Sequence, residues 1–193
     1  MKICFLINNG YGIGGTIRST FNLAQALATQ HEVEIVSVFR HRDAPAFALG
    51  GGVRLVPLVD LREDSPEYAG DEPEHQRRSA VFPAEDWLSP RYSRLTDRRI
   101  AAWLSGTDAD VVFGTRPGLN VHLARQAPRR LIRIAQEHST FEAHPAPLKR
   151  RLRRHYPSLD AITTVTQADA ACYRSRLRLP GVRVAVVPNS VPA

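Results

Sequence analysis

An α/β fold with a doubly wound parallel sheet is predicted by three observations on this sequence of 193 residues. Apolar, β-prone runs alternate with amphipathic stretches, which is typical of parallel sheets covered by helices. The first run, residues 2–7, is apolar after its lysine, as expected of a strand buried on both faces. A glycine-rich turn follows, and its glycines (Gly10, Gly12, Gly14 and Gly15) carry no Cβ that would block close approach to the backbone.

The first half of the chain predicts three strands, two helices and one long polar segment. A helix is expected over 16–29, which is amphipathic, and strands over EVEIVSVF (32–39) and VRLVPLV (53–59), the latter after a turn of three glycines. Residues 60–86 are polar, rich in Pro, Glu and Arg, and without periodicity, so we expect a long surface loop, partly disordered, or an active-site flap. A helix over 88–105 places its apolar residues on roughly one face.

The second half alternates strand and helix without interruption. Strands are predicted over DADVVFGTR, ending near Thr115, over LIRIAQEH, ending at His138, over LDAITTVT, ending at Thr166, and over VRVAVVPN. Helices are predicted over residues 120–126, 147–156 and 167–177. Such alternation builds a sheet with helices on both sides.

Composition limits where the chain acts and what it attracts. Its net charge is +7, and apart from Lys2 and Lys149 the basic residues are arginines. This bias is explained either by a G+C-rich coding sequence or by attraction to phosphates, nucleic acid or a membrane surface. Two cysteines without metal or redox spacing predict a reducing compartment. Because neither a signal peptide nor a run of about 18 apolar residues is found, we expect a cytoplasmic location.

The glycine turn predicts a phosphorylated or nucleotide-bearing ligand. It places free N–H groups and the positive end of a helix dipole beyond the carboxyl end of the first strand. The spacing Gly10-x-Gly12-x-x-Gly15 also matches the dinucleotide fingerprint. However, the second strand ends in Phe39-Arg40-His41-Arg42, without the acidic residue that an NAD site needs. An NADP site, with arginines on the 2′-phosphate, remains open, as does a turn that only connects strand to helix.

Polar residues follow several of the predicted strands. Since the carboxyl ends of parallel strands face the ligand crevice, we expect these residues there. They are Asn8, Asn9, Arg40, Thr115, Arg116, His138, Ser139 and Thr166. His138 is interpreted as a ligand contact. No spacing favours a metal site or a nucleophile elbow.

The segment Lys149–His155 predicts a short helix with a cationic polar face. A solvated surface, an anionic membrane surface, and an anionic ligand or nucleic acid are the three interpretations. Aromatic residues are not interleaved with the charges, so we expect no nucleic-acid partner.

Five segments, spread over nearly the whole chain, match the pattern of one large family. They are Gly14-Gly15 followed by Thr16 and Arg18, the strand DADVVFGTR, His138 ending a central strand, LDAITTVTQADAACYRSRL, and VAVVPNSVPA. On these segments the chain resembles the N-terminal domain of retaining, GT-B-fold glycosyltransferases that carry a Glu-x7-Glu motif in their second domain. The resemblance implies a Rossmann-like domain that forms one half of a GT-B fold.

The resemblance also implies roles for single residues. Gly14, Gly15 and Thr16 would lie against the phosphates of a nucleotide-sugar donor, and His138 would be catalytic, near the transferred sugar. The substrate-binding set would be Asn9, Arg18, Thr115, Arg116, Ser139 and Thr166. No metal and no cofactor beyond the nucleotide sugar are expected. The chain departs from the family pattern at Ser139, Thr166 and Ser190, where aspartate, serine and glycine are usual.

From this resemblance we expect a domain over residues 1–187, the start of a linker at 188–193, and a separate C-terminal domain that supplies most donor contacts. The expected reaction is transfer of a hexosyl group to an acceptor with retention, and this half alone is expected to be inactive. An NADP-dependent oxidoreductase and a non-catalytic nucleotide- or phosphate-binding domain are the alternatives. Peripheral contact with an anionic membrane would place the cytoplasmic protein at a membrane surface.

Overall fold

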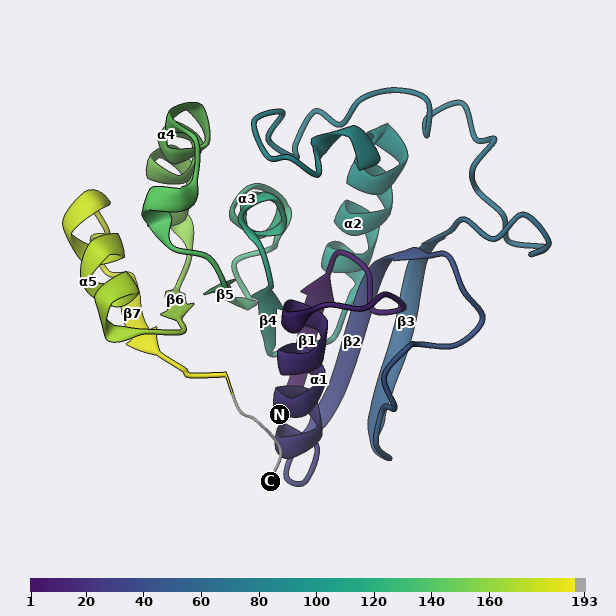
Figure 1. The fold of residues 1–193 in the computed structure, drawn as a ribbon, viewed down its shortest axis with the longest axis horizontal. Coiled ribbons are helices and arrows are strands. Elements are labelled where there is room, and N and C mark those ends of the chain that lie inside the picture. The colour runs from purple at the N-terminus through teal and green to yellow at the C-terminus, as the bar shows by residue number, and fades with distance from the viewer. Residues whose placement is uncertain (190–193) are drawn as a thin grey trace.

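Seven strands form one sheet in the order β3-β2-β1-β4-β5-β6-β7 (Figure 1). In the computed structural model, which describes residues 1–189, all neighbouring strands run parallel. The strands are β1 (Lys2–Ile7), β2 (Glu32–Arg40), β3 (Val53–Asp60), β4 (Val111–Gly114), β5 (Ile132–Glu137), β6 (Ala161–Thr164) and β7 (Arg183–Val186). The predicted doubly wound α/β sheet is confirmed.

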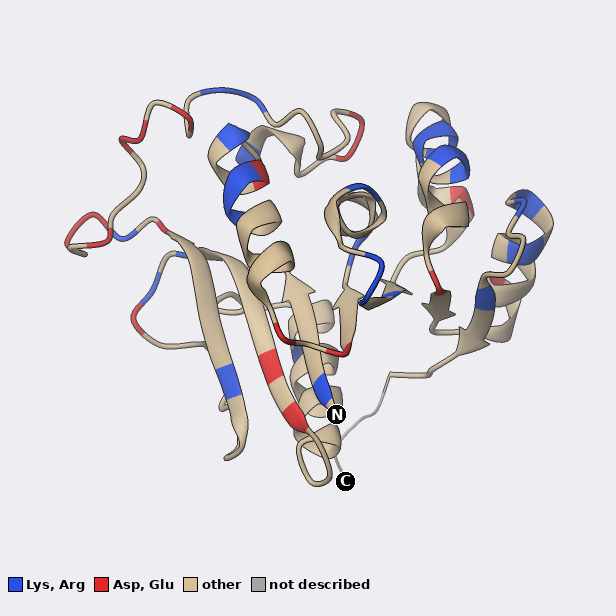
Figure 2. Cartoon of the chain, turned by 180° about the vertical axis from the view of Figure 1, so that it is seen from behind, with Lys and Arg blue, Asp and Glu red and all other residues tan. Residues whose placement is uncertain are grey.

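Helices cover both faces of this sheet because its strands alternate their side chains between two apolar cores. The helices are α1 (Gly15–Leu27), α2 (Arg94–Gly106), α3 (Pro117–Gln126), α4 (Ala146–His155) and α5 (Gln167–Arg176). In β1, Ile3, Phe5 and Ile7 pack on the α1 side, whereas Cys4 and Leu6 pack in the core that α2 to α5 cover. Figure 1 shows α1 in front of the sheet, and Figure 2, the view from behind, shows α2 in front of it.

Several helix ends differ from those predicted, and local chemistry explains them. The helix predicted over 88–105 divides into a short 3-10 turn at Ser89–Arg91 and α2, because Ser93 caps α2. Its side chain accepts a hydrogen bond from the N–H of Thr96, whose hydroxyl in turn accepts one from the N–H of Ser93. Helix α3 begins three residues earlier than predicted, at Pro117, since proline is favoured in the first turn.

The long segment between β3 and α2, residues 61–93, follows one defined path over the top of α2 (Figure 1). Buried Ala69 and Phe82 anchor it, and the Phe82 ring stacks on Tyr92 with centroids 3.6 Å apart. The buried carboxylate of Asp97 accepts hydrogen bonds from Ser79 Oγ at 2.5 Å and from Ala80 N at 2.7 Å. The expectation of partial disorder here is therefore wrong, since a few long-range anchors replace the missing periodicity.

None of the helices within residues 1–189 is long and apolar enough to cross a membrane. The predicted linker, residues 188–193, and the departure at Ser190 lie partly or wholly outside the described residues.

Candidate functional site

A cleft of about 670 Å³ opens across the carboxyl ends of β1, β4 and β5. The chain leaves β1 toward β2 on one side and later returns to β4 on the other, so the cleft lies where the strand order reverses. Ligands of doubly wound sheets bind at such a switch point. Eight of the predicted site residues line the cleft: Asn9, Gly14, Gly15, Thr16, Thr115, Arg116, His138 and Ser139.

The amino end of α1 faces this cleft without a side-chain cap. Gly14 precedes the helix, no side chain accepts a hydrogen bond there, and the first turn contains no acidic residue. A Cβ built on Gly15 would have no atom within 4 Å outside the backbone of α1, so open space lies beside this glycine at the amino end of the helix. This arrangement can accept an anion.

The glycines of the turn keep this space open, and they do so in ordinary backbone conformations. Gly14 is extended, at φ 166°. Within the described residues, only Gly52 and Gly181 have φ between +20° and +160°, the region that favours glycine. A Cβ on Gly10 would lie 2.9 Å from Leu55 Cδ1, so the end of that β3 side chain would have to shift.

Two of the strand-end side chains are held by hydrogen bonds within the chain. The Asn9 amide lies 3.0 Å from His41 Nδ1, and its oxygen accepts a hydrogen bond from Tyr11 N at 2.9 Å. Thr115 donates its hydroxyl proton to the carbonyl oxygen of Leu6 at 3.1 Å and is buried. Both side chains are therefore held in fixed positions in the lining of the cleft.

His138 differs from them, because its Nε2 atom is buried and has no hydrogen-bond partner among residues 1–189. Burial lowers the pKa of His138 to about 4, so the imidazole is neutral at physiological pH. A neutral imidazole carries one donor and one acceptor. It can hydrogen-bond a hydroxyl group of a ligand in the cleft.

A buried carboxylate, Glu137, lies behind this histidine. Its Oε1 atom accepts hydrogen bonds from Asn120 Nδ2 at 2.8 Å and from the Tyr156 hydroxyl. Burial raises the pKa of Glu137, although these bonds oppose the shift. The other oxygen, Oε2, lies 3.9 Å from Nε2 of His144, which itself lines the cleft.

Arg18 and Thr166, two of the residues predicted to bind substrate, lie outside the cleft. The Arg18 guanidinium lies 4.5 Å above the Phe47 ring, in the connection between β2 and β3. Thr166 caps α5 by accepting a hydrogen bond from Asp169 N at 3.1 Å.

The lining residues that were absent from the predicted set include Glu85, Asp86, Trp87 and His144. The first three come from the segment 61–93, for which an active-site flap was one of the two expectations. No local pattern separates these positions from the rest of that polar stretch. Only the folded path of the chain brings them to the cleft.

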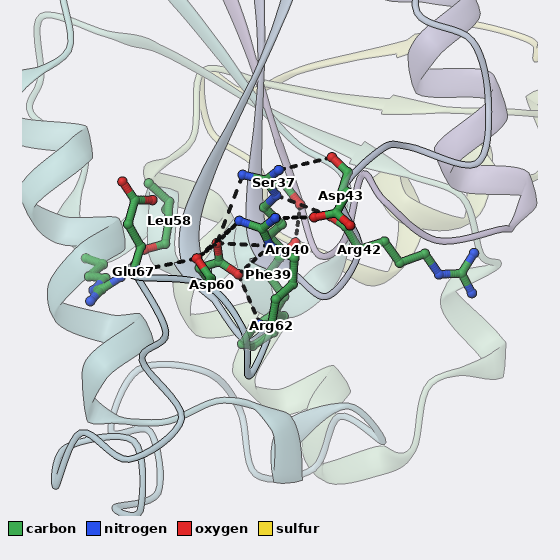
Figure 3. Close-up of polar contacts among 11 residues, drawn as sticks. Ser37, Phe39, Arg40, Arg42, Asp43, Leu58, Asp60, Arg62 and Glu67 are labelled. Carbon is green, nitrogen blue, oxygen red and sulfur yellow. Dashed lines mark hydrogen bonds and ion pairs between the residues drawn. The ribbon is translucent and has the colours of Figure 1, made fainter.

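The two arginines considered for an NADP phosphate, Arg40 and Arg42, do not converge on one point as a phosphate site would require. Arg40 donates hydrogen bonds to the carbonyl oxygens of Arg42 and Asp43, at 3.2 and 3.0 Å, and lies 4.0 Å from Asp60 Oδ2. The Arg42 side chain points away from this cluster (Figure 3). Arg62 binds both oxygens of Asp60, which holds the pKa of Asp60 well below its usual range. The charge of Arg40 is thereby partly neutralised, which disfavours an NADP site.

The fold is that of one half of a GT-B glycosyltransferase. The chain belongs to glycosyltransferase family 4, whose family model matches residues 13–193. A curated relative, an exopolysaccharide phosphotransferase of Streptomyces coelicolor, is 30% identical over 198 residues, which cover the whole of this chain. The chain spans 21% of the length of that relative.

Solved structures share the fold at low sequence identity. Sucrose-phosphate synthase from Thermosynechococcus elongatus matches 97% of this chain with a TM-score of 0.61 at 12% identity. The lipopolysaccharide outer core galactosyltransferase WaaB matches 95% with a TM-score of 0.54, also at 12% identity. Anabaena HepE, solved in complex with UDP and glucose, matches 99% with a TM-score of 0.54 at 14% identity. This chain spans 48%, 45% and 45% of those three chains, respectively.

Proposed function

We propose that this chain is the acceptor-side half of a retaining glycosyltransferase that transfers a hexosyl group from a nucleotide sugar. The observation that carries the proposal is the uncapped amino end of α1, which shares a cleft with the unpaired imidazole of His138. The N–H groups of α1 would stabilise negative charge on the departing phosphate. His138 would hydrogen-bond the transferred sugar.

A nucleotide-sugar donor is supported by the structural relatives. Anabaena HepE has been solved in complex with UDP and with UDP-glucose, and its fold matches 99% of this chain. We propose that a C-terminal GT-B domain supplies most of the nucleotide contacts, so that residues 1–193 alone bind donor weakly and do not transfer sugar.

The name of the Streptomyces relative favours a second candidate, transfer of a sugar phosphate. The two reactions break different bonds of the donor. Sugar transfer breaks the bond between the anomeric carbon and the phosphate oxygen and releases a nucleoside diphosphate. Sugar-phosphate transfer breaks the pyrophosphate linkage and releases a nucleoside monophosphate.

Separating the nucleotide products therefore tests the proposal. The protein, with and without a C-terminal domain, is incubated with UDP- and GDP-hexoses and candidate saccharide acceptors. We expect the nucleoside diphosphate and, by NMR of the product, the donor's anomeric configuration. Release of the nucleoside monophosphate would favour the second candidate, sugar-phosphate transfer. A product with the inverted anomeric configuration would refute the retaining outcome.

We also propose that α4 contacts an anionic membrane surface in the cytoplasm. Leu148 and Leu152 are the buried residues of α4, so its arginines occupy the outer face. Figure 2 marks the positions of the basic residues along the helix in blue. Arg150 and Arg154 are exposed and form no ion pair with any residue that the structure describes. Vesicles with and without phosphatidylglycerol test this contact: we expect co-sedimentation with the anionic vesicles only, and Arg150→Glu with Arg154→Glu should abolish it.

A further inference from the structure

Trp87 is a large apolar side chain that the fold leaves in solvent at the rim of the cleft. Its exposed fraction is 78%, although the residues on both sides of it, Asp86 and Leu88, are almost fully buried. The Asp86 carboxylate accepts a hydrogen bond from Leu88 N at 3.0 Å, so the turn that carries the indole is fixed. An exposed indole at the rim of a cleft offers a ligand a large apolar face to pack against.

Arg116 supports one face of the indole. Its guanidinium lies 5.4 Å from the ring centroid and donates a hydrogen bond to Asp86 Oδ1 at 2.9 Å. The Trp87 ring, the Asp86 carboxylate and the guanidinium thus form one assembly, which we call the Trp87 platform. With the guanidinium on one face, the opposite face of the indole is available for stacking.

Two buried polar atoms, one in the Trp87 platform and one next to it in the chain, lack partners among residues 1–189. Arg116 Nε and Glu85 Oε2 are buried without a hydrogen-bond partner in the part of the chain that the structure describes. Both residues line the cleft together with Trp87. Buried polar groups are nearly always satisfied in the functional state, so a ligand that binds here should offer both donors and acceptors.

From this geometry we infer that the Trp87 platform binds a neutral pyranose ring, the saccharide portion of the acceptor. The inference rests on the proposed function and names the acceptor class. A pyranose presents C–H groups on one face, which pack on an aromatic ring, and hydroxyl groups at its edge, which both donate and accept hydrogen bonds. An apolar chain would leave Arg116 Nε and Glu85 Oε2 unpaired. A phosphate would meet the carboxylates of Glu85 and Asp86.

The chain has two tryptophans, which permits a direct test. Trp103, in α2, packs against the core, so Trp103→Phe leaves Trp87 as the single reporter of fluorescence. This variant is titrated with the methyl glycosides of glucose, galactose and mannose, and separately with UDP. We expect at least one glycoside to shift the Trp87 emission saturably to the blue and to protect it from acrylamide, whereas UDP does neither.

Binding of the same glycoside by calorimetry then identifies the contact. Trp87→Ala should weaken it about ten-fold or more, and Trp87→Phe, which keeps an aromatic face, by less. Melting temperature provides the control for folding, because an exposed side chain contributes little to stability. If no glycoside changes Trp87 emission, or if UDP alone protects it, the pyranose site is refuted. The nucleotide-product assay tests the proposed function independently of Trp87. The pyranose site can therefore be refuted while the proposed function stands.

Discussion

Two groups of strand ends lie on the same edge of the sheet and differ in how their polar atoms are satisfied. The paired strand ends, Asp60 and Arg40 at the ends of β3 and β2, form a closed network with Arg62 (Figure 3). The Ser65 hydroxyl also donates a hydrogen bond to Asp60. The open strand ends, Arg116 and His138 beyond β4 and β5, keep buried nitrogens without partners among the described residues.

The difference separates polar residues that stabilise the sheet from polar residues that we propose bind a ligand. Asp60 is 3% exposed, and its carboxylate receives hydrogen bonds from Arg62 and Ser65, so its burial is compensated. An unpaired buried nitrogen costs free energy unless a ligand completes it. We therefore propose that the open strand ends are the functional part of the edge, and four experiments test this division.

The largest effect is expected at the paired strand ends, from Asp60→Ala. It leaves the cations of Arg62 and Arg40 without their buried partner, which should lower the free energy of unfolding by about 3 kcal/mol in urea titrations. Asp43→Ala is the matched control, because Asp43 also pairs with Arg62 but is 81% exposed. The Asp43→Ala substitution should lower the free energy of unfolding by less than about 1 kcal/mol. Turnover should change little in either variant; a folded but inactive Asp60→Ala protein would contradict the division.

At the cleft, Gly15→Val should lower turnover about 100-fold or more at saturating donor, because the new side chain fills the space above the N–H groups of α1. Since a Cβ on Gly15 meets no atom within 4 Å, the melting temperature should stay near that of the wild type. Gly51→Val serves as control, as a Cβ on Gly51 is equally unobstructed but lies outside the cleft. Wild-type turnover in Gly15→Val would refute the phosphate site.

A smaller loss, about ten-fold, is expected for His138→Ala, which removes one hydrogen bond to the sugar. Kinetics at saturating donor and urea unfolding are measured on the same preparation. Turnover should fall while stability changes less than in Asp60→Ala. If His138→Ala kept its turnover but lost as much stability as Asp60→Ala, His138 would have a structural role instead.

The smallest effect concerns the pH dependence of stability. Burial lowers the pKa of His138 from 6.5 to about 4, so between these values the unfolded chain binds a proton that the folded chain does not. The free energy of unfolding should therefore fall as the pH is lowered from 6.5 to 4, and His138→Ala should flatten this slope. The paired strand ends behave differently: the pKa of Asp60 is lowered by Arg62, so its contribution is lost only at more acidic pH. An unchanged slope in His138→Ala would contradict the burial of a neutral imidazole.

Prediction from the sequence succeeded where the signal is local. Strand β1 was expected over the residues that form it, because an apolar run followed by glycines specifies a buried strand and a turn. Strands β4 and β6 are four residues long, shorter than predicted, because hydrogen-bonded pairing with their neighbours ends before the β-prone residues do. Thr166 was expected at the crevice, yet it caps α5.

The sequence by itself determined the order of the strands and helices and the glycine turn at the switch point, because periodicity and glycine content act over a few neighbouring residues. Only the tertiary structure decided which polar groups are paired and which are left for a ligand. Arg116 and Asp86 are 30 residues apart, and Trp87 reaches the cleft on a segment without any periodic pattern. Such contacts depend on distances between remote parts of the chain, which the packing of the helices on the sheet establishes.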